Sequence, residues 1–267
     1  GQDINLIKLS EINGVTDLNS IDSNIDDIAA LLIQSPNSNG ILENWENSKS
    51  MLKESKSLLI AISDPYSLSV LKTPGQCGAD IYVGEGQSLG NPLNYGGPLL
   101  GLMAVKEKYK RRMPGRIIGK TTDKRNRQGF VLTLQTREQH IRRGKATSNI
   151  CTNQGLLALR STIFLSLMGK VGLPYMTKLS YQKAKYAVKL ISKLEKFTIP
   201  YPDNFISDFL VKTSHSVKDL INYLNTKGLI LIKPIYDKSD TLFLISMTEK
   251  RSKNEIDYLI NCLKEFH

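Results

Sequence analysis

The sequence is poor in the residues that build covalent or metal-bound frameworks. Its three cysteines, Cys77, Cys151 and Cys262, are odd in number and widely separated, so neither a disulfide framework nor a paired-cysteine metal site is expected. The three histidines form no HExxH or HxxxH pair, which argues against a metal centre. We therefore expect reduced thiols, a cytoplasmic location and no bound metal.

Long apolar runs and a secretory leader are also missing. No uninterrupted apolar run reaches the roughly 18 residues that a bilayer requires, and residues 1–4 lack the basic head and apolar core of a signal peptide. Because the chain also lacks an initial Met, we interpret it as a cut or processed piece. Its 267 residues allow about two domains. A globular protein without a membrane partner is expected.

Acidic residues are scarce in one segment of the chain. Residues 106–145 carry fourteen Lys or Arg against three acids, whereas the rest of the chain balances 22 against 22. Such a block attracts anionic partners over roughly 8 Å at physiological salt. An acidic protein is one candidate and a simple solvated surface is another. Nucleic acid is disfavoured because only Tyr109 and Phe130 are interleaved as aromatic residues and no recognition motif is present.

Hydrophobic periodicity predicts an α/β fold in the first part of the chain. Short apolar runs bounded by turn residues predict buried strands at residues 4–9, 28–33, 58–62, 79–83 and 99–105. An amphipathic helix over residues 41–52 makes a strand–helix–strand unit of a parallel-rich sheet. A basic helix to residue 113 and a hairpin of residues 116–119 and 130–134 follow. Thr136 and Gln139 then form a capping box for a helix that ends near residue 145.

Helices and a second small unit are expected in the remainder. Residues 156–167 are apolar nearly all round, which predicts a deeply buried helix ending at Gly169. A connecting helix spans residues 174–196. The later elements are a strand at 209–211, a helix at 217–224, strands at 229–232 and 242–247, and a helix at 254–263 with Thr248 and Ser252 as candidate caps. We predict a partial large domain (1–170), a connector (171–196) and a small α+β domain (197–267).

Glycine, proline and small polar residues gather directly after the strand at 79–83. The stretch 84–98 matches neither a P-loop nor a GxGxxG fingerprint, and the chain contains no GxSxG elbow. It is either a functional loop whose backbone approaches a ligand or an elaborate turn. Asp64 follows the strand at 58–62, where α/β sheets place ligand groups. Its alternative role is to cap a short helix after Pro65.

Four runs of sequence carry a family resemblance. They are GADIYVGEGQSLGNP at residues 78–92, RMPGRI at 112–117, GFVLTLQTREQHIRR at 129–143 and KATSNICTNQ at 145–154. These runs resemble the first subunit of the two-subunit glycine decarboxylase, the P-protein of the glycine cleavage system. The resemblance extends over the whole chain, while the family's first subunit is longer at its N-terminus. The chain is therefore expected to lack that part.

The resemblance implies a pyridoxal-phosphate enzyme fold of type I. In that family the complex decarboxylates glycine and passes the aminomethyl group to the lipoyl arm of the H-protein. The Schiff-base lysine belongs to the second subunit, so the cofactor would be held by this partner and not covalently by this chain. The cofactor supplies the electron sink, and protein residues supply binding and orientation.

The loss of that lysine can be located in this sequence. When the catalytic subunit's lysine motif is laid on residues 86–98 without a gap, lysine falls on Gln87. An amide cannot form an aldimine, because its nitrogen lone pair is delocalised into the carbonyl. The resemblance also makes Asp64 a relic of the residue that pairs with the pyridinium nitrogen.

Glycine and small polar residues are dense in two segments, residues 84–98 and 147–154. We therefore expect these segments to form an interface or a shared site with the second subunit. Its predicted residues are Ser88, Gly90, Asn91, Pro92, Tyr95, Gly96, Gly97, Arg137, His140, Thr147, Ser148 and Asn149. The basic block would dock either the acidic H-protein or the second subunit. Three alternatives stay open: a scaffold without enzyme activity, a nucleic-acid-binding protein, and an autonomous enzyme that uses another lysine such as Lys72 or Lys145.

Overall fold

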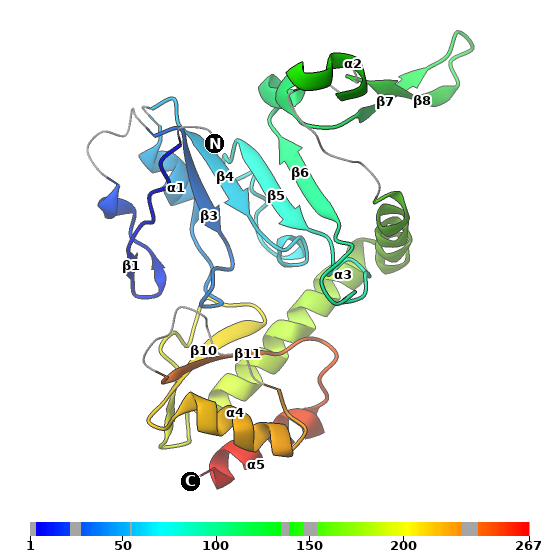
Figure 1. Cartoon of the computed structure of the whole chain (residues 1–267). Helices are drawn as coiled ribbons and strands as arrows, with labels where there is room; N and C mark the ends of the chain where they lie inside the picture. Colours follow the sequence, from blue (N-terminus) through cyan, green and yellow to red (C-terminus); the bar gives the residue numbers. More distant parts are fainter. Residues whose placement is uncertain are drawn as a thin grey trace.

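The computed structural model describes residues 4–21, 28–53, 55–134, 139–146, 154–230 and 240–266. A mixed β-sheet forms the upper part of the molecule in Figure 1, and a smaller sheet covered by helices forms the lower part. One long helix, α3 (Gly155–Ile191), runs beside both parts. A ribbon of two strands projects from the upper part.

The upper sheet has four strands in the order β3 (Ala30–Gln34), β4 (Leu58–Ile62), β5 (Ile81–Glu85) and β6 (Gly101–Val105). β3, β4 and β5 are parallel, and β6 is antiparallel to β5. The helix α1 (Trp45–Met51) connects β3 to β4. Its Trp45 is buried against this sheet and donates through Nε1 to the Ile33 carbonyl. The predicted strand–helix–strand unit is confirmed.

The predicted strand at residues 4–9 is wrong. Residues 4–10 have no regular structure, and the side chains of Ile4, Leu6 and Ile7 are exposed. A tight hairpin follows instead, in which β1 (Glu11–Ile12) pairs with β2 (Val15–Thr16) across Asn13 and Gly14, both at positive φ. An apolar run becomes a strand only where a neighbouring strand pairs with its backbone groups, and the described residues offer no such neighbour to this segment.

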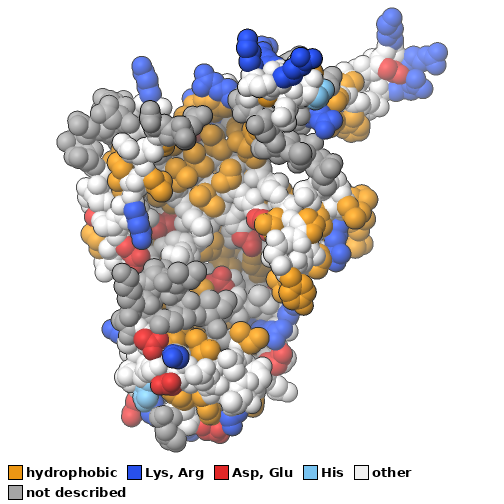
Figure 2. Space-filling model, in the orientation of Figure 1, with side chains coloured by type: hydrophobic (Ala, Val, Ile, Leu, Met, Phe, Trp, Pro, Cys, Tyr) orange, Lys and Arg blue, Asp and Glu red, His pale blue; other side chains and the backbone are white. Residues whose placement is uncertain are grey.

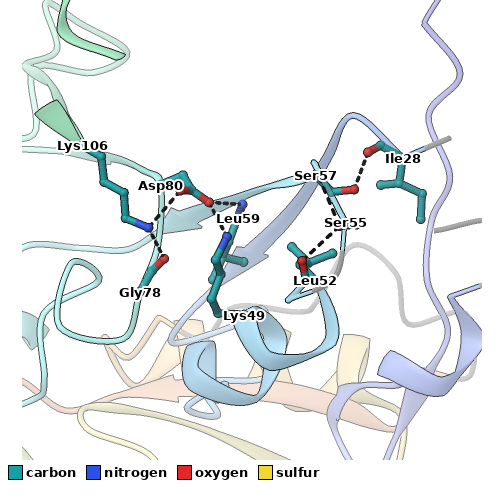
Figure 3. Close-up of polar contacts among 9 residues, drawn as sticks. All are labelled: Ile28, Lys49, Leu52, Ser55, Ser57, Leu59, Gly78, Asp80 and Lys106. Atoms are coloured by element: carbon teal, nitrogen blue, oxygen red, sulfur yellow. Dashed lines mark hydrogen bonds and ion pairs between the residues drawn. The ribbon is translucent and has the colours of Figure 1, made fainter. Parts of the chain in front are cut away.

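A buried carboxylate joins the elements at the amino end of β5 (Figure 3). Asp80, which is 2% exposed, accepts hydrogen bonds from Lys49 Nζ at 2.7 Å, Lys106 Nζ at 2.9 Å and the Leu59 backbone nitrogen at 3.1 Å. Lys49 belongs to α1, Leu59 to β4, and Lys106 follows β6. Burial alone raises the pKa of Asp80, but the hydrogen bonds from both lysines and Leu59 outweigh it and lower the pKa to about 2.

The ribbon that follows β6 confirms the predicted hairpin. A 3-10 helix, η4 (Glu107–Arg112), leads into β7 (Ile117–Thr122) and β8 (Gln128–Thr133), which pair antiparallel. The predicted basic helix is thus of the tighter 3-10 type. Short helices α2 (Gln139–Arg142) and η6 (Arg143–Lys145) come next. Thr136 of the predicted capping box lies outside the described residues.

Helix α3 confirms one prediction and contradicts another. Gly169 has non-helical angles (φ 59°, ψ −169°) and breaks the helix where its end was predicted. The expected deep burial of residues 156–167 is wrong, since Leu156 is 79% and Leu167 is 82% exposed. Among the described residues, this helix is long and apolar enough to cross a membrane, and only 6% of its apolar window is buried. Apolar composition predicted a covered surface, but no described element covers it.

The lower part has its own core. A three-stranded antiparallel sheet has the order β11 (Leu242–Ser246), β10 (Asp208–Thr213) and β9 (Phe197–Thr198). Helices α4 (Val217–Thr226) and α5 (Lys253–Glu265) and the end of α3 supply the remaining buried side chains. Ser252 forms a capping box with Glu255, which confirms it as the cap of α5. The strand predicted at 229–232 lies partly outside the described residues, and the predicted domain boundaries stay predictions.

The two parts meet beside the carboxyl ends of β3 and β4. Ile41 and Phe205 form an isolated antiparallel bridge, and the Leu42 nitrogen donates to the Asn204 carbonyl at 2.8 Å. On the other side, Tyr66 precedes the 3-10 helix η3 (Ser67–Ser69), and its hydroxyl donates to the Met176 carbonyl of α3 at 3.4 Å. These contacts place the first residues of β10 and the residues after β11 opposite the ends of the parallel strands.

We predict that Asp80 makes stability strongly dependent on acid pH. Its folded-state pKa of about 2 lies below the ordinary value of 3.8. The stabilisation is therefore present above about pH 4 and is lost as pH falls towards 2. A shift of this size corresponds to about 2 kcal/mol of unfolding free energy. Asp80→Asn should lower stability at pH 7 by about 2–3 kcal/mol and flatten the dependence below pH 4, as measured by urea unfolding.

Asp203→Asn is the matched control, because Asp203 also pairs with a lysine, Lys185, but is 81% exposed. Exposed pairs contribute little to stability, so this variant should unfold like the parent chain. If Asp80→Asn kept the acid dependence of the parent chain, the structural role assigned to Asp80 would be wrong.

Candidate functional site

A cavity of about 1050 Å³ lies at the carboxyl ends of the parallel strands. Open α/β sheets place ligands at this edge. The cavity is lined from three sides: the ends of β4 and β5 with the loop that follows β5, the amino half of α3, and the lower part of the molecule. The lower part contributes Ser207, Asp208, Ser246, Thr248, Glu249 and Lys250.

The loop after β5 is held by its own polar groups. The carboxylate of Glu85 accepts from the Gln87 nitrogen at 2.8 Å and from the Leu100 nitrogen at 2.9 Å, which closes the base of the loop. The Asn91 amide nitrogen donates to the Gly86 carbonyl at 3.1 Å and to Ser161 Oγ at 2.8 Å. The backbone of this loop therefore follows one fixed course along the cavity wall and is anchored to α3.

Gly90 brings this loop against α3. Its φ is +83°, and a Cβ built there would lie 2.7 Å from Phe164. The backbone can approach the helix this closely only because no side chain intervenes. Arg160 Nε donates to the Gly90 carbonyl at 2.6 Å. These contacts fix the inner face of the amino half of α3, and its apolar outer face remains exposed.

The Gln87 and Asp64 side chains are both engaged by the loop itself. Gln87 Nε2 donates to the Pro92 carbonyl at 3.3 Å. Asp64 Oδ1 accepts from Ser88 Oγ and from the Tyr66 nitrogen, the latter at 2.9 Å. The bond to the Tyr66 nitrogen is a local turn before η3, whose N-cap residue is Tyr66 and has no side-chain cap, so the predicted capping role of Asp64 is not seen. Asp64 does line the cavity.

Acidic groups outnumber basic groups in the cavity wall. The lining residues include four carboxylates and two cations. The carboxylates are Asp64, Glu85, Asp208 and Glu249, and the cations are Arg160 and Lys250. Burial raises the pKa of Asp208, and hydrogen bonding with Ser246 and Ser207 offsets this only in part. In the described part of the chain, two buried side-chain oxygens lack a hydrogen-bond donor, Asp208 Oδ1 and Asn91 Oδ1, and both residues line this cavity. The wall therefore favours hydrogen-bond donors over anions.

The predicted site residues divide into three groups. Asp64, Gln87, Ser88, Gly90, Asn91 and Pro92 line the cavity together. Tyr95, Gly96 and Gly97 form the exposed tip of the loop and His140 lies exposed on α2, so none of these four is among the lining residues. Arg137, Thr147, Ser148 and Asn149 lie outside the described residues.

Sequence reasoning missed the residues that reach the cavity from α3 and the lower part, among them Arg160, Asp208 and Glu249. Arg160 carried one signal, because it is a cation within an apolar helix. Asp208 and Glu249 lie at the start and just beyond the end of separate strands, and nothing local distinguishes them. No group of metal-ligating side chains occurs among the described residues.

Comparison with known proteins identifies the family. The family model described as "Glycine cleavage system P-protein" matches residues 5–263. The chain belongs to the glycine cleavage system P-protein family. It is 45% identical over 260 residues to the "Probable glycine dehydrogenase (decarboxylating) subunit 1" of Desulforamulus reducens, covering 95% of this chain and 58% of the relative. The chain thus spans about three-fifths of the length of the curated relatives it matches.

Solved structures confirm the expected fold. A crystal structure of glycine decarboxylase (P-protein), in inhibitor-bound form, is 34% identical, with a TM-score of 0.91 over 98% of this chain and 60% of that one. A NifS-like protein from Rickettsia africae has a TM-score of 0.68 at 12% identity, over 95% of this chain and 67% of that one, and shows the fold alone. This P-protein family member has the α/β type I fold of pyridoxal-phosphate enzymes.

The loop wall of the cavity offers no amine that could hold pyridoxal phosphate covalently. Gln87 is an amide, and no lysine lies in the loop from residue 84 to residue 93, while Lys250 lines the cavity from the lower part of the molecule. A phosphate group would meet more carboxylates than cations. Asp64 Oδ1 already accepts two hydrogen bonds, from the Tyr66 nitrogen and from Ser88 Oγ. We therefore assign this cavity no chemical step that depends on the cofactor.

We predict that Gly90→Ala disturbs the loop more than Gly96→Ala. Both glycines have positive φ, but an added Cβ collides with Phe164 only at Gly90, while nothing lies within 4 Å at Gly96. Backbone strain of about 1–2 kcal/mol applies at both sites, and overpacking adds about 1–3 kcal/mol at Gly90. Thermal unfolding should show the larger loss of stability for Gly90→Ala. Equal losses would contradict the close contact between the loop and α3.

Proposed function

We propose that this chain is the non-lysine-bearing subunit of a two-subunit glycine decarboxylase, working in the cytoplasm. The assembled enzyme would decarboxylate glycine and transfer the aminomethyl group to the lipoyl group of the H-protein. Pyridoxal phosphate would be held by the second subunit. The observation that carries the proposal is Gln87, an amide at the position where the family's catalytic subunit has its lysine, in a chain that belongs to the P-protein family.

The surroundings of Gln87 support a role without covalent catalysis. The side chain is tied to the Pro92 carbonyl, and its amide nitrogen is not nucleophilic. The acidic wall of the cavity opposes a bound phosphate. Relatives that match nearly the whole chain carry the name "subunit 1", which supports a division of labour with a second subunit.

The exposed tip of the glycine loop would then serve the partner's site, while residues 147–153 of the second predicted segment lie outside the described residues. Tyr95 is fully exposed at the tip of the glycine loop, between Asn94 and Gly96, and all three residues have a positive φ. The loop base is fixed by Glu85 and Asn91, so its tip is presented at a set position. We infer that this tip contacts the second subunit and helps to shape its active site.

We predict that glycine-dependent exchange of carbon dioxide requires both chains. This chain alone should show no exchange, and exchange should appear when the second subunit and lipoylated H-protein are added. Borohydride reduction followed by peptide mapping should place the pyridoxyl label on the second subunit only. A label on this chain, for instance at Lys72 or Lys145, together with glycine turnover, would support an autonomous enzyme instead. Failure to co-elute with the second subunit would favour a scaffold or nucleic-acid-binding role.

Tyr95→Ala should reduce exchange in the reconstituted complex without lowering the thermal stability of this chain, because Tyr95 is fully exposed in it. The double variant Asn91→Ala, Tyr95→Ala should lose more activity. Asn91→Ala removes the amide that joins the loop to Ser161, at a cost of about 1–3 kcal/mol for buried partners left unpaired. The control is Tyr258→Ala, a tyrosine that is 46% exposed on α5, far from the loop in Figure 1. Full activity of the double variant would reject a role for the loop.

A further inference from the structure

The β7–β8 ribbon has two unlike faces. Its register pairs Ile118 with Leu132, Lys120 with Phe130 and Thr122 with Gln128. Side chains of directly opposed residues lie on the same side of the ribbon, and successive pairs alternate between sides. These six residues therefore form one face, which we call the apolar face of the ribbon. The other face contains Ile117, Gly119, Thr121, Gly129, Val131 and Thr133, of which Val131 is the exposed large apolar side chain.

The apolar face is exposed along its whole length. All six of its residues are exposed, with Phe130 at 67% and Ile118 at 60%. Figure 1 shows the ribbon extending away from the body of the molecule, and Figure 2 shows hydrophobic side chains along this projection with blue cationic groups at its end. An isolated two-stranded ribbon is at best marginally stable in water. A row of large apolar groups on such a ribbon indicates a surface that is covered in the working protein.

Cations lie on the apolar face and beside it. Lys120 is one of its six residues, and Arg116, Lys124, Arg125 and Arg127 belong to the rest of the ribbon or its turn, with Asp123 as the acid that accompanies them. Asp123 accepts from Arg127 Nε at 2.8 Å and from the backbone nitrogens of Arg125 and Arg127, so it shapes the turn. The hydrogen bonds to these groups lower the pKa of Asp123. Large apolar side chains with cations among and beside them are complementary to a protein surface that combines apolar and acidic groups.

We propose that the apolar face of the ribbon is a permanent docking surface for the second subunit, which offers it a patch that combines apolar and acidic groups. This inference rests on the proposed function and selects between the two partners considered for the basic block. Permanent interfaces are more hydrophobic than transient ones. A carrier that must leave after each turnover would expose Ile118, Phe130 and Leu132 to water in every cycle. A permanent subunit keeps them covered and stabilises the ribbon.

Site-specific photo-crosslinking tests the contact in the assembled complex. p-Benzoylphenylalanine replaces Gln128, on the apolar face, or Thr121, an exposed residue of the opposite face that serves as the control. The chain carrying it is co-expressed with the second subunit from the same organism and irradiated. Position 128 should crosslink to the second subunit at least fivefold more than position 121. Crosslinks confined to the H-protein, to a second copy of this chain or to its own polypeptide would overturn the proposal.

Paired serine variants supply an energetic readout. Phe130→Ser and Val131→Ser both remove an apolar β-former from neighbouring positions of β8, but only Phe130 lies on the apolar face. Phe130→Ser should raise the dissociation constant of the two subunits at least tenfold, and Val131→Ser should change it less than threefold. Circular dichroism and thermal unfolding of each isolated variant check that both chains fold. Equal effects of the two variants would overturn the proposal.

The two proposals fail in different ways. If the subunits assemble and exchange carbon dioxide but position 128 does not crosslink to the second subunit, the docking surface is wrong and the proposed function stands. If no complex with a second subunit forms in any variant or in the parent chain, the proposed function itself is wrong, and the docking proposal fails with it. A membrane as the occupant would appear as binding to anionic vesicles that Phe130→Ser abolishes, and this result would also overturn the docking proposal.

Discussion

The architecture depends on one buried carboxylate at the amino edge of the sheet. Asp80 draws a lysine from α1, a lysine after β6 and a backbone nitrogen of β4 to the same point. A buried charge without partners is costly, so the three elements are constrained to meet there. The register of β4, β5 and β6 set at this edge determines where their opposite ends lie. The glycine loop and Asp64 emerge from those ends, so the site inherits its geometry from a contact on the far side of the sheet.

At the carboxyl edge the chain has the fold of pyridoxal-phosphate enzymes, and the loop after β5 carries an amide, Gln87. The loop that carries Gln87 remains closely packed, with Glu85 at its base, Asn91 bridging to Ser161 and Gly90 pressed on Phe164. Such packing is what a rigid catalytic loop requires, and it is equally suited to presenting a loop tip to another chain. The acidic cavity and its two buried oxygens without donors separate this wall from one that would hold a phosphate. A closely packed loop that carries an amide at position 87 supports the proposal that this chain has a supporting rather than a catalytic role.

Two exposed apolar surfaces show that the described part of the chain does not bury all of its large apolar side chains. The amino half of α3 is fixed on its inner side by Arg160 and Phe164 and open on the other, and the β7–β8 ribbon has one open apolar face. Both surfaces belong to segments whose sequences have strong hydrophobic patterns. Burial of apolar area drives folding and association by the same free energy per unit area. A pattern of this kind therefore indicates that a surface will be covered but not whether the cover comes from the same chain or another.

The sequence by itself determined the local elements and the chemical identity of the residues in the glycine loop. The strands β4 and β5, the hairpin, the helix break at Gly169, the cap at Ser252 and the amide at Gln87 were all readable, because each depends on neighbouring residues or on chemical identity. Only the tertiary structure decided that residues 4–9 form no strand, that the apolar helix lies open, and that Asp208 and Glu249 reach the cavity. Those outcomes depend on which distant segment lies opposite, and short-range patterns carry no information about long-range contacts.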